Sequence, residues 1–187
     1  MRRFALLLTL LLVPETALAQ RTVFRTLLDG YVRYRPTAAW RVLRTVADRE
    51  GDGVLLGARD AADSGLSALL IAYPRTLRGS FEALTDSLLQ AHAPGNNAVR
   101  TGDRATDSLR VVLWTADSPS GRLLAIDRLV LLPKAVVYAR VAMPAIPPAD
   151  PDQIPLRLEV IDDLLTTIHA DGRVLFPSGA QFAIKVF

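Results

Sequence analysis

The chain has 187 residues, half of them hydrophobic and 6% aromatic, and its formal net charge is +3. This composition excludes a generally disordered polypeptide, and the length favours one ordinary domain with a core of its own. The chain has no cysteine, which excludes disulfides, thiolate nucleophiles and cysteine-bound metals. No run of Arg and Lys is interleaved with aromatic residues, so nucleic-acid binding is not expected.

Residues 1–19 have the three parts of a secretory signal peptide: an Arg pair, an apolar run from Phe4 to Val13, and Ala-Leu-Ala immediately before Gln20. As a helix the apolar run would be about 15 Å long, whereas the hydrocarbon core of a bilayer is about 30 Å thick. The pattern predicts an exported, periplasmic protein. The leader is either cleaved after Ala19 or retained as an anchor.

Seven arginines lie between Gln20 and Arg49, against only two aspartates, whereas the rest of the chain after Arg49 is net acidic. A basic segment that follows an apolar leader can contact anionic lipid headgroups or an acidic protein. The alternative is a solvated strand face. We take three of these residues as candidate partner-binding residues: Arg33, Arg35 and Arg41.

The first half of the chain shows short strand patterns separated by turns. Residues 31–35 alternate in the manner of a strand that ends at Pro36, and Trp40 opens a further apolar run. Turns at residues 49–53 and 60–65 enclose a strand predicted at residues 54–58, and another strand is predicted at residues 67–73. These segments predict an antiparallel meander.

The segment from Leu109 to Met143 has three apolar runs, separated by a Ser-Pro-Ser-Gly turn and by a break at Pro133, which predicts a second antiparallel meander. Such a sheet needs a cover, and two amphipathic helices are predicted to supply it, at residues 80–92 and 156–169. Residues 96–107 are predicted to form a polar connection with one short strand near Val99. Both tryptophans are expected in the core. The predicted fold class is α+β.

The last fifteen residues hold three of the six phenylalanines of the chain, Phe176, Phe182 and Phe187. Alternation near the end is typical of an edge strand of the same sheet, and the alternative is an apolar arm that docks on a partner. We include these three residues among the candidate partner-binding residues. The predicted organisation is therefore a leader at 1–19, a single domain at 20–172 and an apolar tail at 173–187.

No nucleophile elbow, phosphate loop, dinucleotide fingerprint or zinc-protease motif is present in the sequence. His92 and His169 could join Asp86 or Asp163 in a metal site, but each is predicted in the last turn of a helix, where a cation-capable side chain favours the helix dipole. We expect helix capping rather than metal binding. Asp162 and its neighbour point about 100° apart on a helix, so shared acid–base work is not expected. No enzyme activity, cofactor or metal is predicted.

Four segments carry a family resemblance: YRPTAAW at residues 34–40, FEALTDSLL at 81–89, GDRATDSLRVVLW at 102–114 and VIDDLLTTI at 160–168. Their order resembles the PsbP and DcrB-like superfamily of small exported α/β/α sandwiches, although Ala39 stands where that group usually has glycine. PsbP relatives are typically extrinsic accessory subunits on the lumenal face of photosynthetic complexes, and DcrB relatives are envelope proteins without established chemistry. The resemblance implies accessory binding rather than catalysis.

Export, the basic segment and this resemblance together predict a non-catalytic accessory subunit. It would associate with the periplasmic face of a membrane protein complex, such as a photosynthetic one, or with other envelope proteins, with the membrane surface as a further contact. The first alternative is a free periplasmic ligand-binding module with its pocket between sheet and helix. A hydrolase without a recognisable motif is the third hypothesis.

Overall fold

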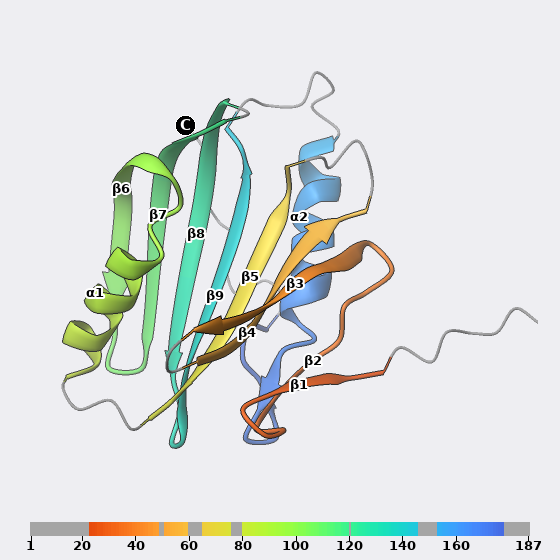
Figure 1. Cartoon of the computed structure of the whole chain (residues 1–187), viewed down its shortest axis with the longest axis vertical. Coiled ribbons are helices and arrows are strands. Elements are labelled where there is room, and N and C mark those ends of the chain that lie inside the picture. Colours follow the sequence, from red (N-terminus) through yellow and green to blue (C-terminus); the bar gives the residue numbers. More distant parts are fainter. Residues whose placement is uncertain are drawn as a thin grey trace, which may run out of the picture.

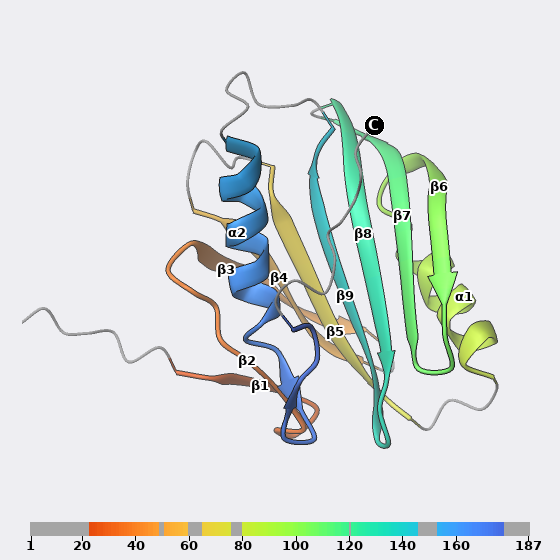
Figure 2. The same ribbon diagram turned by 180° about the vertical axis from the view of Figure 1, so that it is seen from behind.

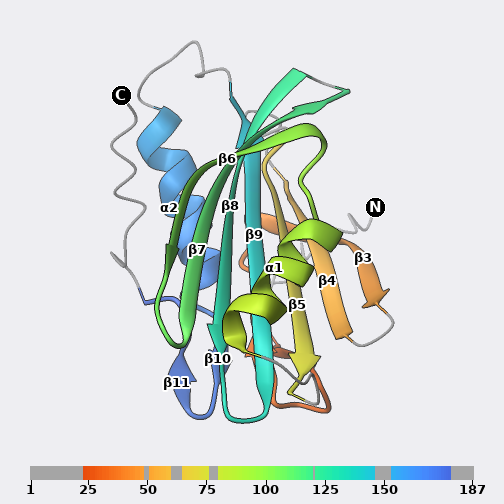
Figure 3. The same cartoon turned by 90° about the vertical axis from the view of Figure 1, so that its left-hand side faces the viewer.

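The fold is a twisted antiparallel sheet of seven strands that lies between two helices (Figures 1 and 3). The computed structural model describes residues 23–48, 51–59, 65–75, 80–119, 121–145 and 153–177. The predicted leader, Phe182 and Phe187 lie outside these residues. The fold class predicted from the sequence, α+β with antiparallel strands and two covering helices, is confirmed.

Eleven strands and two helices are present in the described chain. In order they are β1 (Arg25–Leu27), β2 (Val32–Tyr34), β3 (Trp40–Asp48), β4 (Gly51–Ala58), β5 (Ser67–Pro74), α1 (Phe81–Ala91), β6 (Asn96–Ala105), β7 (Leu109–Ser118), β8 (Gly121–Leu131), β9 (Ala135–Pro144), α2 (Gln153–Leu165), β10 (His169–Ala170) and β11 (Arg173–Val174). No helix among them is long and apolar enough to cross a membrane.

Two meanders join to make the large sheet, whose strand order is β3-β4-β5-β9-β8-β7-β6. Both meanders predicted from the sequence are present, as β3-β4-β5 and β7-β8-β9, but β2, which was predicted as part of the first, pairs with β1 and β10 instead. The two meanders join because β5 pairs with β9 in antiparallel register, with Ile71 opposite Tyr138. A second sheet of four short strands, in the order β1-β2-β10-β11, lies beside the end of α2; we call it the small sheet (Figure 2).

Each face of the large sheet has its own core, because successive residues of a strand point to opposite faces. In β5, Ile71 and Tyr73 pack with Leu89 of α1, whereas Leu70 and Ala72 belong to the core that includes Ile161 of α2. The buried side chains of the small sheet, such as Val32 and Ala170, belong to the same core as Ile161. Full burial of a Leu or Ile side chain contributes about 1.5–3 kcal/mol.

The first helix follows the sequence prediction closely. Ser80 is its N-cap, and the Ser80 hydroxyl oxygen accepts a hydrogen bond from the backbone N–H of Ala83 at 3.2 Å. This bond satisfies one of the four N–H groups that a helix start leaves without partners. Leu88 and Leu89 of this helix are buried.

The second helix ends earlier than predicted, at Leu165, so His169 lies in strand β10 and not in a last helical turn. Asp171 and Gly172 then form the two-residue turn of a β10-β11 hairpin, with φ of 51° and 73°. Positive φ at both central residues is the geometry of a type I′ turn, for which Asp-Gly is a favoured pair. Capping of α2 by His169 was therefore a wrong prediction.

The segment predicted as a polar connection is also different in the structure. Residues 96–105 form β6, an edge strand of ten residues that pairs with β7 along its length. Its register shifts twice, between Asn96 and Val99 and between Arg100 and Gly102, and most of its side chains are exposed. These irregularities break the alternation by which a strand is recognised.

The start of the predicted tail belongs to the fold. Strand β11 pairs with β10, the backbone N–H of Leu175 donates to the carbonyl of Ile168 at 2.8 Å, and Phe176 is only 2% exposed. Phe176 packs in the core beneath α2, so its assignment as a partner-binding residue was wrong. The described domain continues to Pro177, beyond the boundary predicted after Gly172.

Candidate functional site

The predicted arginines stand on exposed positions of β2 and β3. In β2, Val32 and Tyr34 are buried, so the alternation of the strand turns Arg33 outward. Arg35 follows the strand, and its backbone N–H and carbonyl are both bonded to the Thr167 hydroxyl, at 3.1 and 3.0 Å. This bridge fixes the exit of β2 against the end of α2.

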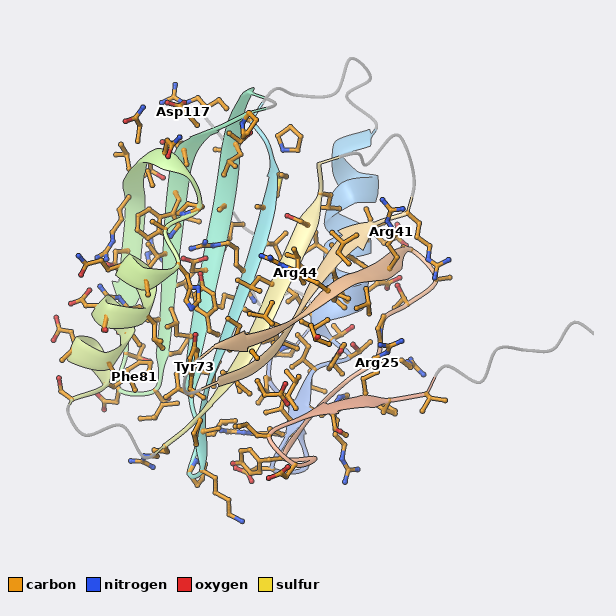
Figure 4. The ribbon with its side chains drawn as sticks, viewed as in Figure 1. Arg25, Arg41, Arg44, Tyr73, Phe81 and Asp117 are labelled. Carbon is orange, nitrogen blue, oxygen red and sulfur yellow. The ribbon has the colours of Figure 1, made fainter. Side chains whose placement is uncertain are left out.

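Arg41 is positioned by its buried neighbour. Trp40 is 1% exposed and donates its indole N–H to the carbonyl of Val160 at 3.0 Å, which ties the start of β3 to α2. Arg41 and Arg44 are exposed on β3, the outermost strand on this side of the large sheet, with Leu43 between them at a bulge. Figure 4 shows Arg41 and Arg25 on the side of the molecule away from α1. We call Arg41, Leu43 and Arg44 the β3 edge.

The outward side chains of the small sheet form a row across its four strands. Thr26, Arg33, His169 and Val174 are successive Cα partners in β1, β2, β10 and β11. Opposite residues in antiparallel strands point to the same face and lie within about 5.5 Å of one another. The structure therefore brings Arg33 beside His169, which the sequence had placed on a helix.

Phe24 and Arg35 extend this row. The Phe24 ring meets the His169 ring edge to face, with centroids 6.0 Å apart, and the Arg35 guanidinium carbon lies 5.6 Å from the centroid of the Phe24 ring. We call the set Phe24, Thr26, Arg33, Arg35, His169 and Val174 the outer face. Phe24 was not selected as a candidate from the sequence. The signal that could have identified it is its position as an aromatic residue within the arginine-rich segment.

The outer face and the β3 edge are electrostatically unbalanced. Among the described residues, Arg33, Arg35, Arg41 and Arg44 form no ion pair with a carboxylate, and neither set contains an acidic residue. The nearby Asp171 accepts a hydrogen bond from the Tyr31 hydroxyl at 2.5 Å. Four cations without a carboxylate partner, two on the outer face and two on the β3 edge, attract an anionic partner.

A buried polar cluster lies on the opposite side, beneath α1. The Asp127 carboxylate is fully buried and receives three donors: Arg140 Nε at 2.6 Å, Arg140 Nη2 at 2.7 Å and the Trp114 indole N–H at 2.7 Å. Arg140 also donates from Nη1 to the carbonyl of His92, at the end of α1. Because both carboxylate oxygens are engaged and no part is exposed, Asp127 is placed to tie α1 to the sheet.

Tyr138 lies beside this cluster. Burial, together with the negative charge of Asp127, holds the pKa of the Tyr138 hydroxyl well above its ordinary value, so the phenol is neutral at physiological pH. The His92 ring stacks on the Tyr138 ring at a centroid distance of 5.2 Å, and its Nε2 lies 2.6 Å from the Tyr73 hydroxyl. His92 is the C-cap residue as predicted, but Arg140 supplies the cation at the helix end.

The structure does not bring the two histidines together, since His92 packs beneath α1 and His169 lies on the small sheet. Among the residues that the model describes, no group of three or more His, Asp or Glu side chains is arranged to hold a metal ion. Asp162 was considered in the sequence as part of a carboxylate pair. Burial lowers the pKa of the Arg128 guanidinium, and the negative charge of Asp162 opposes this shift.

A second ion-pair network joins α1 to the β6-β7 edge. Arg110 lies 2.6 Å from the Asp103 carboxylate and 2.9 Å from that of Asp86, and it also donates to the buried Thr85 hydroxyl. The hydrogen bond from Arg110 is the main cause that lowers the pKa of Asp103 below its ordinary 3.8. The folded state therefore favours the ionised carboxylate.

This network predicts a loss of stability in acid. A carboxyl group whose pKa is lower in the folded state stabilises the fold fully above its unfolded pKa, and the contribution disappears as the pH falls through the folded pKa. Asp103→Asn should therefore lower the urea midpoint at pH 7, and the difference from wild type should shrink below about pH 4. The exposed Asp107→Asn is the control. An Asp103→Asn deficit that is the same at pH 7 and pH 3 would contradict the ion pair.

No protein-family model matches this chain, and no curated protein is significantly similar to it in sequence. Among solved structures, the solution structure of cyanobacterial PsbP (CyanoP) from Synechocystis sp. PCC 6803 is similar in fold, with a TM-score of 0.52. The match covers 79% of this chain and 91% of that chain at 9% sequence identity. It shows a fold-level resemblance to PsbP, in agreement with the resemblance drawn from the sequence.

Proposed function

We propose that the protein is a non-catalytic exported accessory subunit that associates with the periplasmic face of a membrane protein complex. The observation that carries the proposal is the set of uncompensated arginines on the outer face and the β3 edge. The fold-level likeness to a cyanobacterial PsbP supports an accessory role. A photosynthetic membrane complex is the first class of partner to test.

The geometry favours a binding surface over a reaction centre. The arginines are held by a rigid frame, because β2 is fixed through Thr167 and β3 through Trp40. The buried polar groups around Asp127 are instead bonded to one another, since Arg140 and Trp114 both donate to the Asp127 carboxylate. Exposed, uniformly positive side chains on a firm sheet provide electrostatic complementarity to an acidic partner and accelerate its association.

No observation on the described residues favours either alternative, the free ligand-binding module or the hydrolase. A free ligand-binding module was expected to have its pocket between sheet and helix, where core residues such as Leu89 of α1 and Ile161 of α2 pack against the large sheet. The hydrolase hypothesis needs a nucleophile beside a base. The described site offers basic and aromatic side chains instead.

Charge reversal tests the proposal. The variant Arg33→Glu/Arg35→Glu/Arg41→Glu is expected to reduce recovery of the protein with native membranes about tenfold, because each exposed charge contributes roughly 0.2–1 kcal/mol to an ionic contact. Wild-type recovery should fall in a similar way as salt rises, since the Debye length is about 10 Å at 0.1 M and about 3 Å at 1 M.

The matched control is Arg75→Glu/Arg104→Glu/Arg122→Glu, which has the same net charge but alters exposed arginines on other parts of the molecule. Membrane recovery should survive in this variant. Equal losses in the two variants would mean that net charge alone matters. Recovery indifferent to salt and to the first variant would refute the proposed surface.

A further inference from the structure

Exposed apolar side chains gather beside the outer face. Val23 is 74% exposed, Phe24 45% and Val174 37%, and these are three of the six large exposed hydrophobic residues in the described chain. Val23 and Phe24 are consecutive in the sequence, and Val174 is far from them in sequence but close in the fold, since Phe24 contacts the His169 ring and Val174 is the Cα partner of His169. Single exposed hydrophobic residues are ordinary, but a group of them marks an interaction surface.

Phe24 is held outward by its neighbours. The Phe24 and His169 rings pack edge to face, and the Arg35 guanidinium makes a cation–π contact with the Phe24 ring. Such contacts contribute modestly at exposed sites, but they reduce the freedom of a side chain that would otherwise rotate in water. The aromatic ring is therefore presented together with a guanidinium, in a fixed arrangement.

This combination fits the surface of a bilayer. Apolar rings and side chains favour the boundary between headgroups and acyl chains, while Arg side chains remain at the level of the phosphates. The outer face has both kinds of residue and no carboxylate that would be repelled by anionic lipids. A soft headgroup layer also requires no matching shape, whereas a protein partner must supply a pocket for Phe24.

The position of the predicted leader in the sequence also favours a bilayer as the partner of the outer face. Val23 is the first described residue, and only nine residues separate it from Val13, the end of the apolar run of the leader. Nine residues span at most about 30 Å when fully extended. Wherever the apolar run of the predicted leader is held in a membrane, the N-terminal end of the outer face would therefore lie within about 30 Å of that run.

We propose that the outer face and the adjoining Val23 dock on an anionic lipid bilayer, with Val23 and Phe24 entering the headgroup layer and Arg33 and Arg35 contacting lipid phosphates. The inference rests on the proposed function for its location at a membrane, and it names the lipid as the partner of this part of the surface. It leaves the β3 edge, with Arg41 and Arg44, for an acidic protein.

Vesicle sedimentation tests the proposal without any partner protein. The chain from Gln20 onward keeps every described residue and lacks the leader, so binding reports on the domain. It should sediment with phosphatidylcholine vesicles that contain phosphatidylglycerol, and not with pure phosphatidylcholine. Phe24→Ser should weaken binding about tenfold, the effect of withdrawing one buried aromatic side chain. Arg33→Gln/Arg35→Gln should weaken it about 25-fold, at about a fivefold loss for each cation near the surface.

Two controls match these changes on other parts of the chain. Val99→Ser removes an exposed apolar side chain from β6, and Arg104→Gln/Arg122→Gln removes two exposed cations. Both should bind like wild type, and melting temperatures should show that every variant is folded. Absence of sedimentation with anionic vesicles, or equal losses in test and control variants, would overturn the proposal.

Native membranes separate this inference from the proposed function. If anionic vesicles are not bound but native membranes bind in a salt-dependent manner that needs Arg33, Arg35 and Arg41, the lipid inference is wrong and the accessory-subunit function stands. If anionic vesicles are bound as expected, and protease-treated native membranes bind as well as untreated ones, the lipid inference stands and the protein complex is not the partner.

Discussion

Replacing Asp127 with alanine is expected to lower the free energy of unfolding by about 3–5 kcal/mol, the cost of leaving a buried charge without its partner. Arg140 is 8% exposed and has two of its nitrogens on Asp127, so its charge would stay in the core beneath α1 without a counter-ion. The Trp114 indole N–H would lose its acceptor as well. Against a total stability of about 5–15 kcal/mol, this is a large fraction.

Chemical denaturation of matched variants checks this expectation. Asp117→Ala removes an exposed carboxylate from β7 that accepts one hydrogen bond, from Asn97, and should change stability by no more than about 1.5 kcal/mol. The double variant Asp127→Leu/Arg140→Met should recover much of the loss, because a buried ion pair replaced by apolar side chains of similar volume is often tolerated. An Asp127→Ala variant as stable as Asp117→Ala would show that Arg140 finds another partner.

The buried cluster around Asp127 shows which features of the fold could be predicted from the sequence and which could not. The meander around β8 could be predicted, because its apolar residues outnumber the polar ones and its turns contain proline or glycine. Asp127 and Arg140 lie in the middle of β8 and β9 as directly opposed Cα partners. A charge within a strand pattern normally indicates the solvent side, and only the register shows that two opposite charges meet beneath a helix.

Tertiary pairing also decided where α2 ends. Apolar periodicity continues through Ile168, which favours a longer helix, yet the chain leaves the helix at Leu165. The Thr167 hydroxyl bonds to the backbone of Arg35, and His169 pairs with Arg33 in β2, so contacts with a segment more than 130 residues earlier replace another helical turn. Such partners cannot be read from local sequence.

The candidate site was predictable in part. Arginines 33, 35 and 41 were selected because of the charge excess before Arg49, and the structure places all three on exposed positions. That Arg33 and Arg35 share a face with His169 and Val174 depends on the β10-β11 hairpin, which was predicted as the end of a helix and the start of an apolar tail. The Asp171-Gly172 pair was the signal for that hairpin.

The tail gives the second large expected effect. Phe176→Ala should lower the free energy of unfolding by about 3–5 kcal/mol, the usual range for truncating a buried aromatic residue. Phe176 is 2% exposed in the core beneath α2, and the Arg128 guanidinium carbon lies 5.9 Å from the centroid of its ring. Phe24→Ala is the matched control, because the same side chain is removed from an exposed position and the loss should stay below about 1 kcal/mol.

Two truncations extend this test to the whole tail. A chain that ends at Pro177 keeps β11, Phe176 and every other described contact, whereas a chain that ends at Gly172 loses the hairpin partner of β10 and the Phe176 ring together. The shorter chain should melt at least as far below wild type as Phe176→Ala does. If its melting temperature instead equals that of the wild type, residues 173–176 contribute nothing to the stability of the fold. The hypothesis of a docking arm that starts at Arg173 would then stand again. Because β10 also holds His169 beside Arg33, loss of β11 should weaken membrane recovery through the outer face as well as stability.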